Sequence, residues 1–119
     1  MSNIIASGQE KFLVLPAEGQ PIEKASDAND LLAAAMAAGA AWVVIPIGRL
    51  GQEFLQLRTR IAGEFFQKFV TYRIGCAVIG DITDLVAASS ALRDFVHETN
   101  KGRTILFAPD LDDLLVKLG

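Results

Sequence analysis

The sequence predicts an α/β fold with one small sheet of about five strands, most of them parallel. Short, uniformly apolar runs occur at 42–45, 75–79 and 104–107, and stretches with helical periodicity separate them. Parallel strands that are covered by helices show this pattern. A chain of 119 residues has the length of one domain, so we expect a single α/β domain over residues 1–119.

The expected element order is ββαβαβαβα. We expect apolar runs at 3–6 and 11–15 to form a hairpin across Ser7-Gly8-Gln9. An alanine-rich helix follows, with Ser26 as its cap and Gly39 as its stop. The later elements are a strand at 42–45, a long helix from Glu53, a strand at 75–79, a helical turn after Thr83, a helix from Ser89 or Ser90 to Asn100, a strand at 104–107 and a helix at 110–118.

The long helix carries one charge, Arg58, inside its apolar arc. An unpaired cation there is costly if it is dry, so we expect Arg58 to meet a carboxylate, Asp81 first and Asp94 second. The alternative is that its stem lies on the phenylalanines while the guanidinium reaches solvent. Gly63 in mid-helix indicates the close approach of another group, unless it is simply tolerated.

The polar side of the same helix has Arg60, Glu64 and Lys68 at i, i+4 and i+8, which allows a charge ladder on a solvated surface. Residues 49–73 hold five basic side chains against two acidic ones. This basic middle fits an acidic partner or an anion, or else it is ordinary solvated surface.

Composition excludes several classes of protein. Hydrophobic residues make up 51% of the chain and charged residues 21%, which excludes disorder, and the apolar runs are too short to span a bilayer. The first residues lack the features of a secretory signal, so we expect a cytoplasmic protein without a membrane partner. A net charge of -3 argues against nucleic acid.

No residue spacing identifies a reaction. His97-Glu98 lacks the second histidine of a zinc-protease helix, and the single Cys76 lies in an apolar run, so we expect no catalytic set, no metal and no cofactor. Gly48-Arg49-Leu50-Gly51 before a helix is a weak anion signal that an ordinary turn also explains. On the helix at 90–100, Arg93 and Asp94 can join a local ion-pair network with His97 and Glu98.

Two segments resemble an uncharacterised bacterial family, domain of unknown function 4180. They are 54–81 and 90–103, with Thr59, Gly80-Asp81 and Asn100 through Arg103 among the matching residues. In the family pattern a Gly follows the Thr, whereas this chain has Arg60. The family implies no established activity. The element order is also similar to that of sulfate transporter and anti-sigma-factor antagonist domains, although their phosphorylatable Ser or Thr is missing from 48–53.

Two functions follow as hypotheses. The first is a non-enzymatic regulatory or protein-interaction module, a homodimer with a possible protein partner, that docks through the long helix and adjoining loops. The alternative is a small-molecule binder or enzyme for an anionic ligand, with its site at the carboxyl ends of the strands. The candidate binding or interaction residues are Arg58, Thr59, Glu64, Lys68, Asp81, Arg93, Asp94, Asn100 and Arg103.

Overall fold

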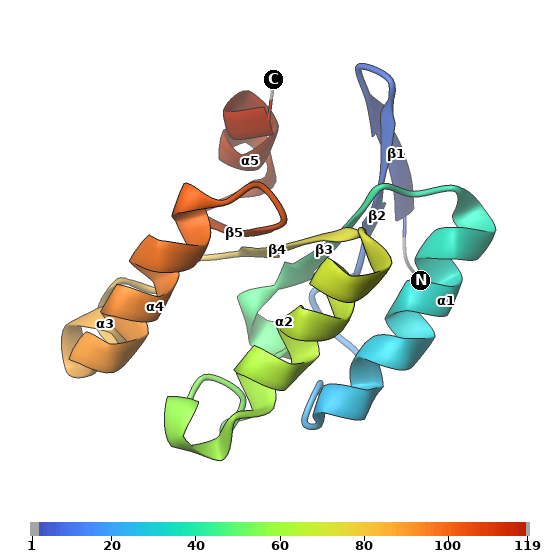
Figure 1. The fold of residues 1–119 in the computed structure, drawn as a ribbon. Coiled ribbons are helices and arrows are strands. Elements are labelled where there is room, and N and C mark those ends of the chain that lie inside the picture. The colour runs from blue at the N-terminus through green and yellow to red at the C-terminus, as the bar shows by residue number, and fades with distance from the viewer. Residues whose placement is uncertain (1–2, 119) are drawn as a thin grey trace.

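A computed structural model describes residues 3–118. These residues form one five-stranded sheet in the order β1-β2-β3-β4-β5, with helices on both of its faces (Figure 1). The elements are β1 Asn3–Ser7, β2 Glu10–Val14, α1 Ala28–Ala38, β3 Trp42–Pro46, α2 Ile61–Tyr72, β4 Gly75–Ile79, α3 Thr83–Ala88, α4 Ser90–Lys101, β5 Ile105–Ala108 and α5 Leu111–Leu118. The predicted fold class and element order are therefore confirmed.

β1 and β2 form the antiparallel hairpin that the sequence predicts. Ser7 lies opposite Glu10, and Gly8 between them has φ 63°. A positive φ at the first of two loop residues is the geometry of a type II′ turn, whose twist matches that of the strands. The turn therefore fixes which residues of β1 face β2.

The other strands are parallel, and their side chains divide the core into two layers. Leu13, Val43, Cys76 and Phe107 point toward α1, α2 and α4. Phe12, Trp42, Ala77 and Leu106 point to the opposite face, which α5 covers through Leu114. Because each strand lies beside the next one along the chain, the crossover helices share one face, and α5 is left to cover the other (Figure 1).

The cap of α1 differs from the prediction. Ser26 makes no capping hydrogen bond, whereas the carboxylate of Asp27 accepts from the backbone N–H of Glu23 at 2.9 Å and of Lys24 at 3.1 Å. A short 3₁₀ turn at Ala25–Asp27 precedes α1. The N-cap position of α1 therefore falls on Asp27, one residue later than expected. The stop at Gly39 is confirmed, with φ 69°.

The prediction of one long helix from Glu53 is wrong. The chain forms turns and a 3₁₀ segment at Leu57–Thr59, and α2 begins only at Ile61. The Thr59 hydroxyl donates to the carbonyls of Gln56 and Glu53 and accepts from the Ile61 N–H at 3.3 Å, while Arg60 has φ 64°. A threonine side chain that bonds the local backbone competes with a continuous helix, and here it starts a new one.

Tertiary packing of Phe54 accounts for the break. On a continuous helix Phe54 would lie about 16 Å from Phe65 along the axis, at ~1.5 Å per residue. Because the chain turns, the centroids of the two rings lie only 5.0 Å apart and the rings are nearly perpendicular. The ring centroids of Phe54 and Phe66 lie 5.7 Å apart. Phe54 is fully buried. The turn therefore brings this apolar side chain back from the distant end of a helix into the core, where its burial stabilises the fold.

Gly63 does not admit a close neighbour, contrary to the expectation. A Cβ at this position would meet no atom within 4 Å. Gly75 is different, because a Cβ there would lie 2.4 Å from the ring of Trp42. Close packing therefore requires a glycine at the start of β4, not in the middle of α2.

None of the helices within residues 3–118 is long and apolar enough to cross a membrane. Residues 1, 2 and 119 of the expected single domain lie outside the described part, and that expectation stays a prediction.

Candidate functional site

The predicted pairing of Arg58 with Asp81 or Asp94 is wrong. Arg58 is exposed and donates to the side-chain oxygen of Gln56 at 3.2 Å. The ion pairs found among residues 3–118 do not include it. Since the helix is broken at Thr59, Arg58 leaves the apolar arc and its guanidinium needs no buried partner. Of the alternative interpretation, the exposure of the guanidinium is confirmed.

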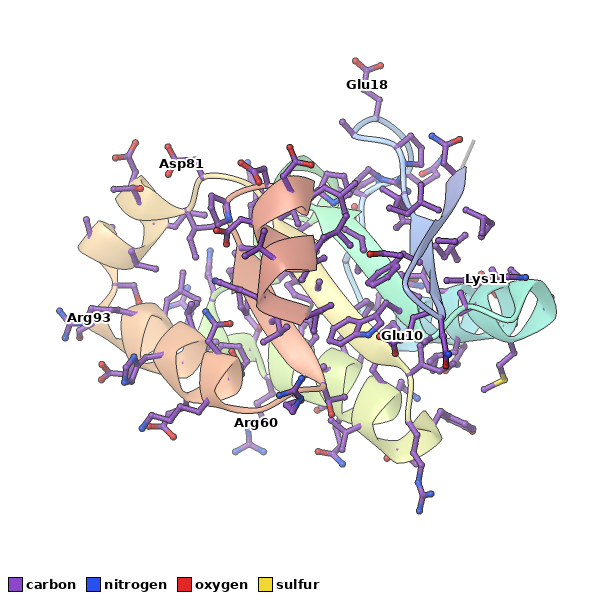
Figure 2. The ribbon with its side chains drawn as sticks, turned by 90° about the horizontal axis from the view of Figure 1, so that it is seen from above. Glu10, Lys11, Glu18, Arg60, Asp81 and Arg93 are labelled. Carbon is purple, nitrogen blue, oxygen red and sulfur yellow. The ribbon has the colours of Figure 1, made fainter. Side chains whose placement is uncertain are left out.

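Asp81 is instead bound by its own turn. Its carboxylate accepts from both the N–H of Thr83, at 2.9 Å, and the Thr83 hydroxyl, at 2.5 Å. These hydrogen bonds lower the pKa of Asp81, because they favour the ionised form. Gly80, with φ 142°, packs against Ile47 and leaves Asp81 at the surface (Figure 2). Asp81 thus fixes the start of α3, and this structural role accounts for its position without a ligand.

The loop around Arg49 is also occupied by its own chain. The Arg49 guanidinium donates to the carbonyl of Gln20 at 2.9 and 3.1 Å and to that of Pro16 at 3.1 Å. It lies directly beneath Gly19, where a Cβ would approach its central carbon to 2.8 Å. The cation therefore clamps the connection after β2 and is not presented to an external anion.

The remaining predicted residues on α2 and α4 lie on exposed or half-buried surface. The Arg60, Glu64 and Lys68 ladder does not form, because Arg60 has left the helix and no ion pair joins the three within residues 3–118. Arg93 pairs with its neighbour Asp94 at 3.6 Å and projects into solvent (Figure 2). A pair this exposed contributes little to stability.

Asn100 closes the β5 edge of the sheet. Its Oδ1 accepts from the Phe107 N–H at 2.7 Å and its Nδ2 donates to the Phe107 carbonyl at 3.2 Å, and Lys117 also reaches that carbonyl at 3.4 Å. The side chain of Asn100 therefore takes the place of a neighbouring strand at this residue, which is one way in which proteins protect a sheet edge.

The hollows at the carboxyl ends of the strands do not favour an anion. The larger, about 660 Å³, is lined by Glu23 and Glu53 against Lys24. Another, about 200 Å³, contains Asp81 and no cation. Neither is lined by Arg58, so the residues of the predicted carboxyl-end site are not brought together.

Cations gather at the opposite ends of the strands. A hollow of about 250 Å³ is lined by Arg73 and Arg103 over Trp42, with Glu10 as its acidic residue. Glu10 lies on the α5 side of β2 and Lys11 on the other (Figure 2). The chain has a net charge of -3, so this local excess of positive charge is unusual for the molecule.

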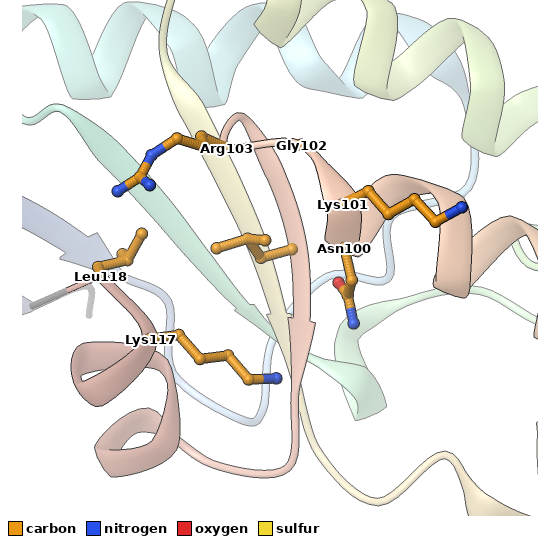
Figure 3. Close-up of a pocket in the computed structure, with 7 residues that line it drawn as sticks. Asn100, Lys101, Gly102, Arg103, Lys117 and Leu118 are labelled. Atoms are coloured by element: carbon orange, nitrogen blue, oxygen red, sulfur yellow. The ribbon is translucent and has the colours of Figure 1, made fainter.

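An adjoining hollow of about 330 Å³ shares Arg103 and Leu118 with the first. Figure 3 shows its cations arriving from three segments, Lys101 from the end of α4, Arg103 from the loop before β5 and Lys117 from α5. The buried side chain of Leu106 lines it too. We call the two hollows together the basic groove; its charged residues are Glu10, Arg73, Lys101, Arg103 and Lys117.

The cations of the groove differ in how they are neutralised. Lys101 pairs with Glu98 at 3.2 Å, and Lys117 pairs with Asp113 at 3.4 Å. Within residues 3–118, Arg73 and Arg103 have no ion pair. The two arginines are therefore the groups best able to bind an external anion.

Residues 7–118 match the model of a protein family described as Domain of unknown function (DUF4180). The chain belongs to the DUF4180 family. Neither the search of curated proteins nor that of solved structures found a match. The analogy to anti-sigma-factor antagonist domains thus stays a prediction.

The departure of this DUF4180 chain from the pattern at Arg60 has a physical meaning. Arg60 has φ 64°, in the left-handed region that glycine adopts without strain. A Gly after the Thr is therefore what the turn before α2 favours, and the arginine is held there by the surrounding structure. The hydroxyl of Thr59, beside it, accepts from the first N–H of α2, so the presence of Thr59 needs no ligand to explain it.

Sequence reasoning identified Arg103 but missed Arg73, Lys101 and Lys117 as parts of one DUF4180 surface. One local signal was available for Arg73: it directly follows α2, at a position where a glycine commonly ends a helix. In the structure Arg73 has the left-handed backbone of that position, with φ 59°. No local signal marks Lys117, since α5 reaches β5 only through tertiary packing.

Proposed function

We propose that this DUF4180 chain is a non-enzymatic interaction module that works as a homodimer. The observation that carries the proposal is the difference between the two edges of its sheet. Asn100 and Lys117 close the β5 edge at Phe107. No side chain within residues 3–118 makes a comparable hydrogen bond to β1.

β1 has none of the usual features that prevent strands from pairing. Its sequence, NIIAS, contains no charge and no proline, and its register with β2 runs without a bulge. Native proteins usually protect an edge strand with at least one of these features. Ile4 is 45% exposed and Ile5 is half-buried, so apolar surface is available beside the open backbone.

The hydrogen bonds of β2 determine which groups of β1 face outward. The Lys11 carbonyl accepts from Ala41 at 2.9 Å, so Lys11 directs its backbone to β3. Its partner across the hairpin, Ala6, therefore forms a non-hydrogen-bonded pair, and by alternation so does Ile4. The N–H and C=O groups of Ile4 and Ala6 point away from the sheet.

A second copy related by a two-fold axis complements this pattern. With Ile5 on the axis, Ile4 lies opposite Ala6 of the second copy, and the outward groups of each satisfy those of the other. The same strand serves both sides, as a closed two-fold interface requires. Ile5 then meets Ile5 of the second copy at a non-hydrogen-bonded position, where side chains are closest.

The chemistry of the single thiol and histidine supports a non-enzymatic role. Cys76 is fully buried, and this burial raises the pKa of its thiol, which disfavours the reactive thiolate. His97 is exposed and lines none of the hollows described above. Residues 3–118 contain no cluster of three or more His, Cys, Asp or Glu that could hold a metal.

Light scattering during gel filtration tests the dimer. The chain is expected to elute with twice the mass of one copy. Ala6→Pro removes an outward N–H that the hairpin does not use, so it should yield a folded monomer. Ala6→Thr keeps the N–H and should remain a dimer. A monomer before any substitution, or a dimer that survives Ala6→Pro, contradicts the proposal.

Disulfide trapping tests the register. Ile5→Cys places two thiols opposite each other across the axis, at about 4.5 Å between Cα atoms, which a disulfide can bridge. Oxidation should therefore link the two copies. Ser7→Cys, on the same strand, lies opposite Asn3 of the second copy and should not form the link. Equal linking of both variants would rule out this register.

A further inference from the structure

We propose that the basic groove binds an extended acidic segment of a partner protein. Arg73 and Arg103 hold its carboxylates, while an apolar side chain of the segment lies against Leu106 and Leu118. The hollows that form the groove share Arg103 and Leu118, so a single chain can occupy both. This inference is independent of the dimer, since it uses no residue of β1.

Charge complementarity determines the kind of occupant. The groove is lined by four cations and by Glu10 as its acid, in a chain with a net charge of -3. Arg73 and Arg103 are exposed and have no ion pair within residues 3–118, so each is free to form a charge-assisted hydrogen bond.

The shape of the groove favours a peptide over a small anion. Its cations come from separate segments, the end of α2, the end of α4, the loop before β5 and α5, and they do not converge on one point. Figure 3 shows the Lys101 ammonium directed away from the Arg103 guanidinium. An extended chain, which advances about 3.3 Å per residue, can meet such spaced charges one after another.

The backbone at Arg73 supports a role for its side chain. Arg73 has φ 59° at the end of α2, a conformation that glycine would adopt with less strain. Non-glycine residues in such conformations are frequent at functional sites. The strain is independent of the groove's charge, and Arg73 lines the same hollow as Trp42.

Fluorescence anisotropy with a labelled peptide Glu-Leu-Glu-Glu-Leu-Glu-Glu tests the inference. The peptide should bind, and added salt should weaken the binding because ions screen the contacts. The same peptide with Lys in place of Glu should not bind. Trp42, the single tryptophan of the chain, should change its emission as the acidic peptide is added, because it lines the groove.

Arg73→Gly with Arg103→Gln should weaken binding of the acidic peptide about tenfold, the sum of two exposed charge contacts. Arg73→Gly relieves backbone strain, so the variant should unfold at a temperature no lower than the original chain. Thermal unfolding then shows that any loss of binding does not come from a loss of folding. The matched control is Arg60→Gly with Arg93→Gln, which makes the same changes outside the groove, the first at a similar φ of 64°. The control should bind as the original chain does.

Three results would overturn the inference: no binding of the acidic peptide, equal weakening in the control, or equal binding of the lysine peptide. Competition separates the other occupants. If inorganic phosphate displaces the peptide at matched charge concentration, the groove is a small-anion site. If a single-stranded oligonucleotide binds more tightly than the peptide, the partner is a nucleic acid. Either result would contradict the acidic segment as the occupant of the groove.

Discussion

The side chain of Asn100 binds both backbone groups of Phe107, accepting from the N–H at 2.7 Å and donating to the carbonyl at 3.2 Å. The last turn of α4 thus acts as a substitute strand along β5. This contact occupies the outward backbone groups of Phe107 on the β5 edge, whereas no side chain within residues 3–118 makes a comparable hydrogen bond to β1.

Asn100→Ala is expected to destabilise the protein by about 1–3 kcal/mol, because it leaves the part-buried N–H of Phe107 without its acceptor. Urea unfolding followed by circular dichroism measures the loss. His97→Ala changes an exposed residue of the same helix and should have little effect. If the two variants are equally stable, the bond to Phe107 contributes nothing.

Gly75→Ala is expected to cost about 1–3 kcal/mol, because the new methyl group overlaps the buried ring of Trp42. Trp42 emission should also shift to longer wavelength if the ring moves toward solvent. Gly63→Ala is the matched control in the middle of α2. It meets open space and should stabilise the protein by about 1 kcal/mol. A neutral Gly75→Ala would contradict the close packing.

Arg60→Gly is expected to stabilise the protein by about 1 kcal/mol, since glycine adopts φ 64° without the steric cost of a side chain. The midpoint of thermal unfolding should rise. Arg58→Gly, two residues earlier in the 3₁₀ segment, has no positive φ to relieve and should instead destabilise. Destabilisation by Arg60→Gly would mean that the arginine side chain itself holds this turn.

Asp27 is expected to make the protein sensitive to acid. The Glu23 N–H donates to its carboxylate and lowers its pKa; burial opposes this, and the N–H and charge of Lys24 lower the pKa further. A carboxyl group with a lower pKa in the folded state stabilises the fold above its unfolded pKa, and this stabilisation is lost as the pH falls through the folded value. The loss should therefore appear below about pH 4.

Unfolding free energies measured across this pH range check the expectation. Asp27→Asn should flatten the dependence of stability on pH, because the titrating group is gone. Asp30→Asn, in the first turn of α1, removes a carboxyl group that accepts no hydrogen bond within residues 3–118 and serves as the control. If both variants retain the original slope, other carboxyl groups cause the acid response.

The sequence by itself determined the fold class, the element order and most element ends. Apolar runs marked strands, and local signals placed the ends correctly at Gly39 and Gly102. They left Ser89 and Ser90 open as the cap of α4; Ser89 accepts from the Leu92 N–H at 3.1 Å. These features depend on neighbours within a few residues, so a local pattern contains them. The break at Thr59 was the exception, since the helical periodicity of the segment continued through it.

Only the tertiary structure decided which residues lie together. Phe54 contacts Phe65 because burying it in the core outweighs one continuous helix, and that choice moved Arg58 to the surface. The basic groove likewise joins Arg73 to Arg103, thirty positions apart, through the parallel order of β4 and β5. Strand order and packing are properties of the whole chain, and no local spacing in the sequence records them.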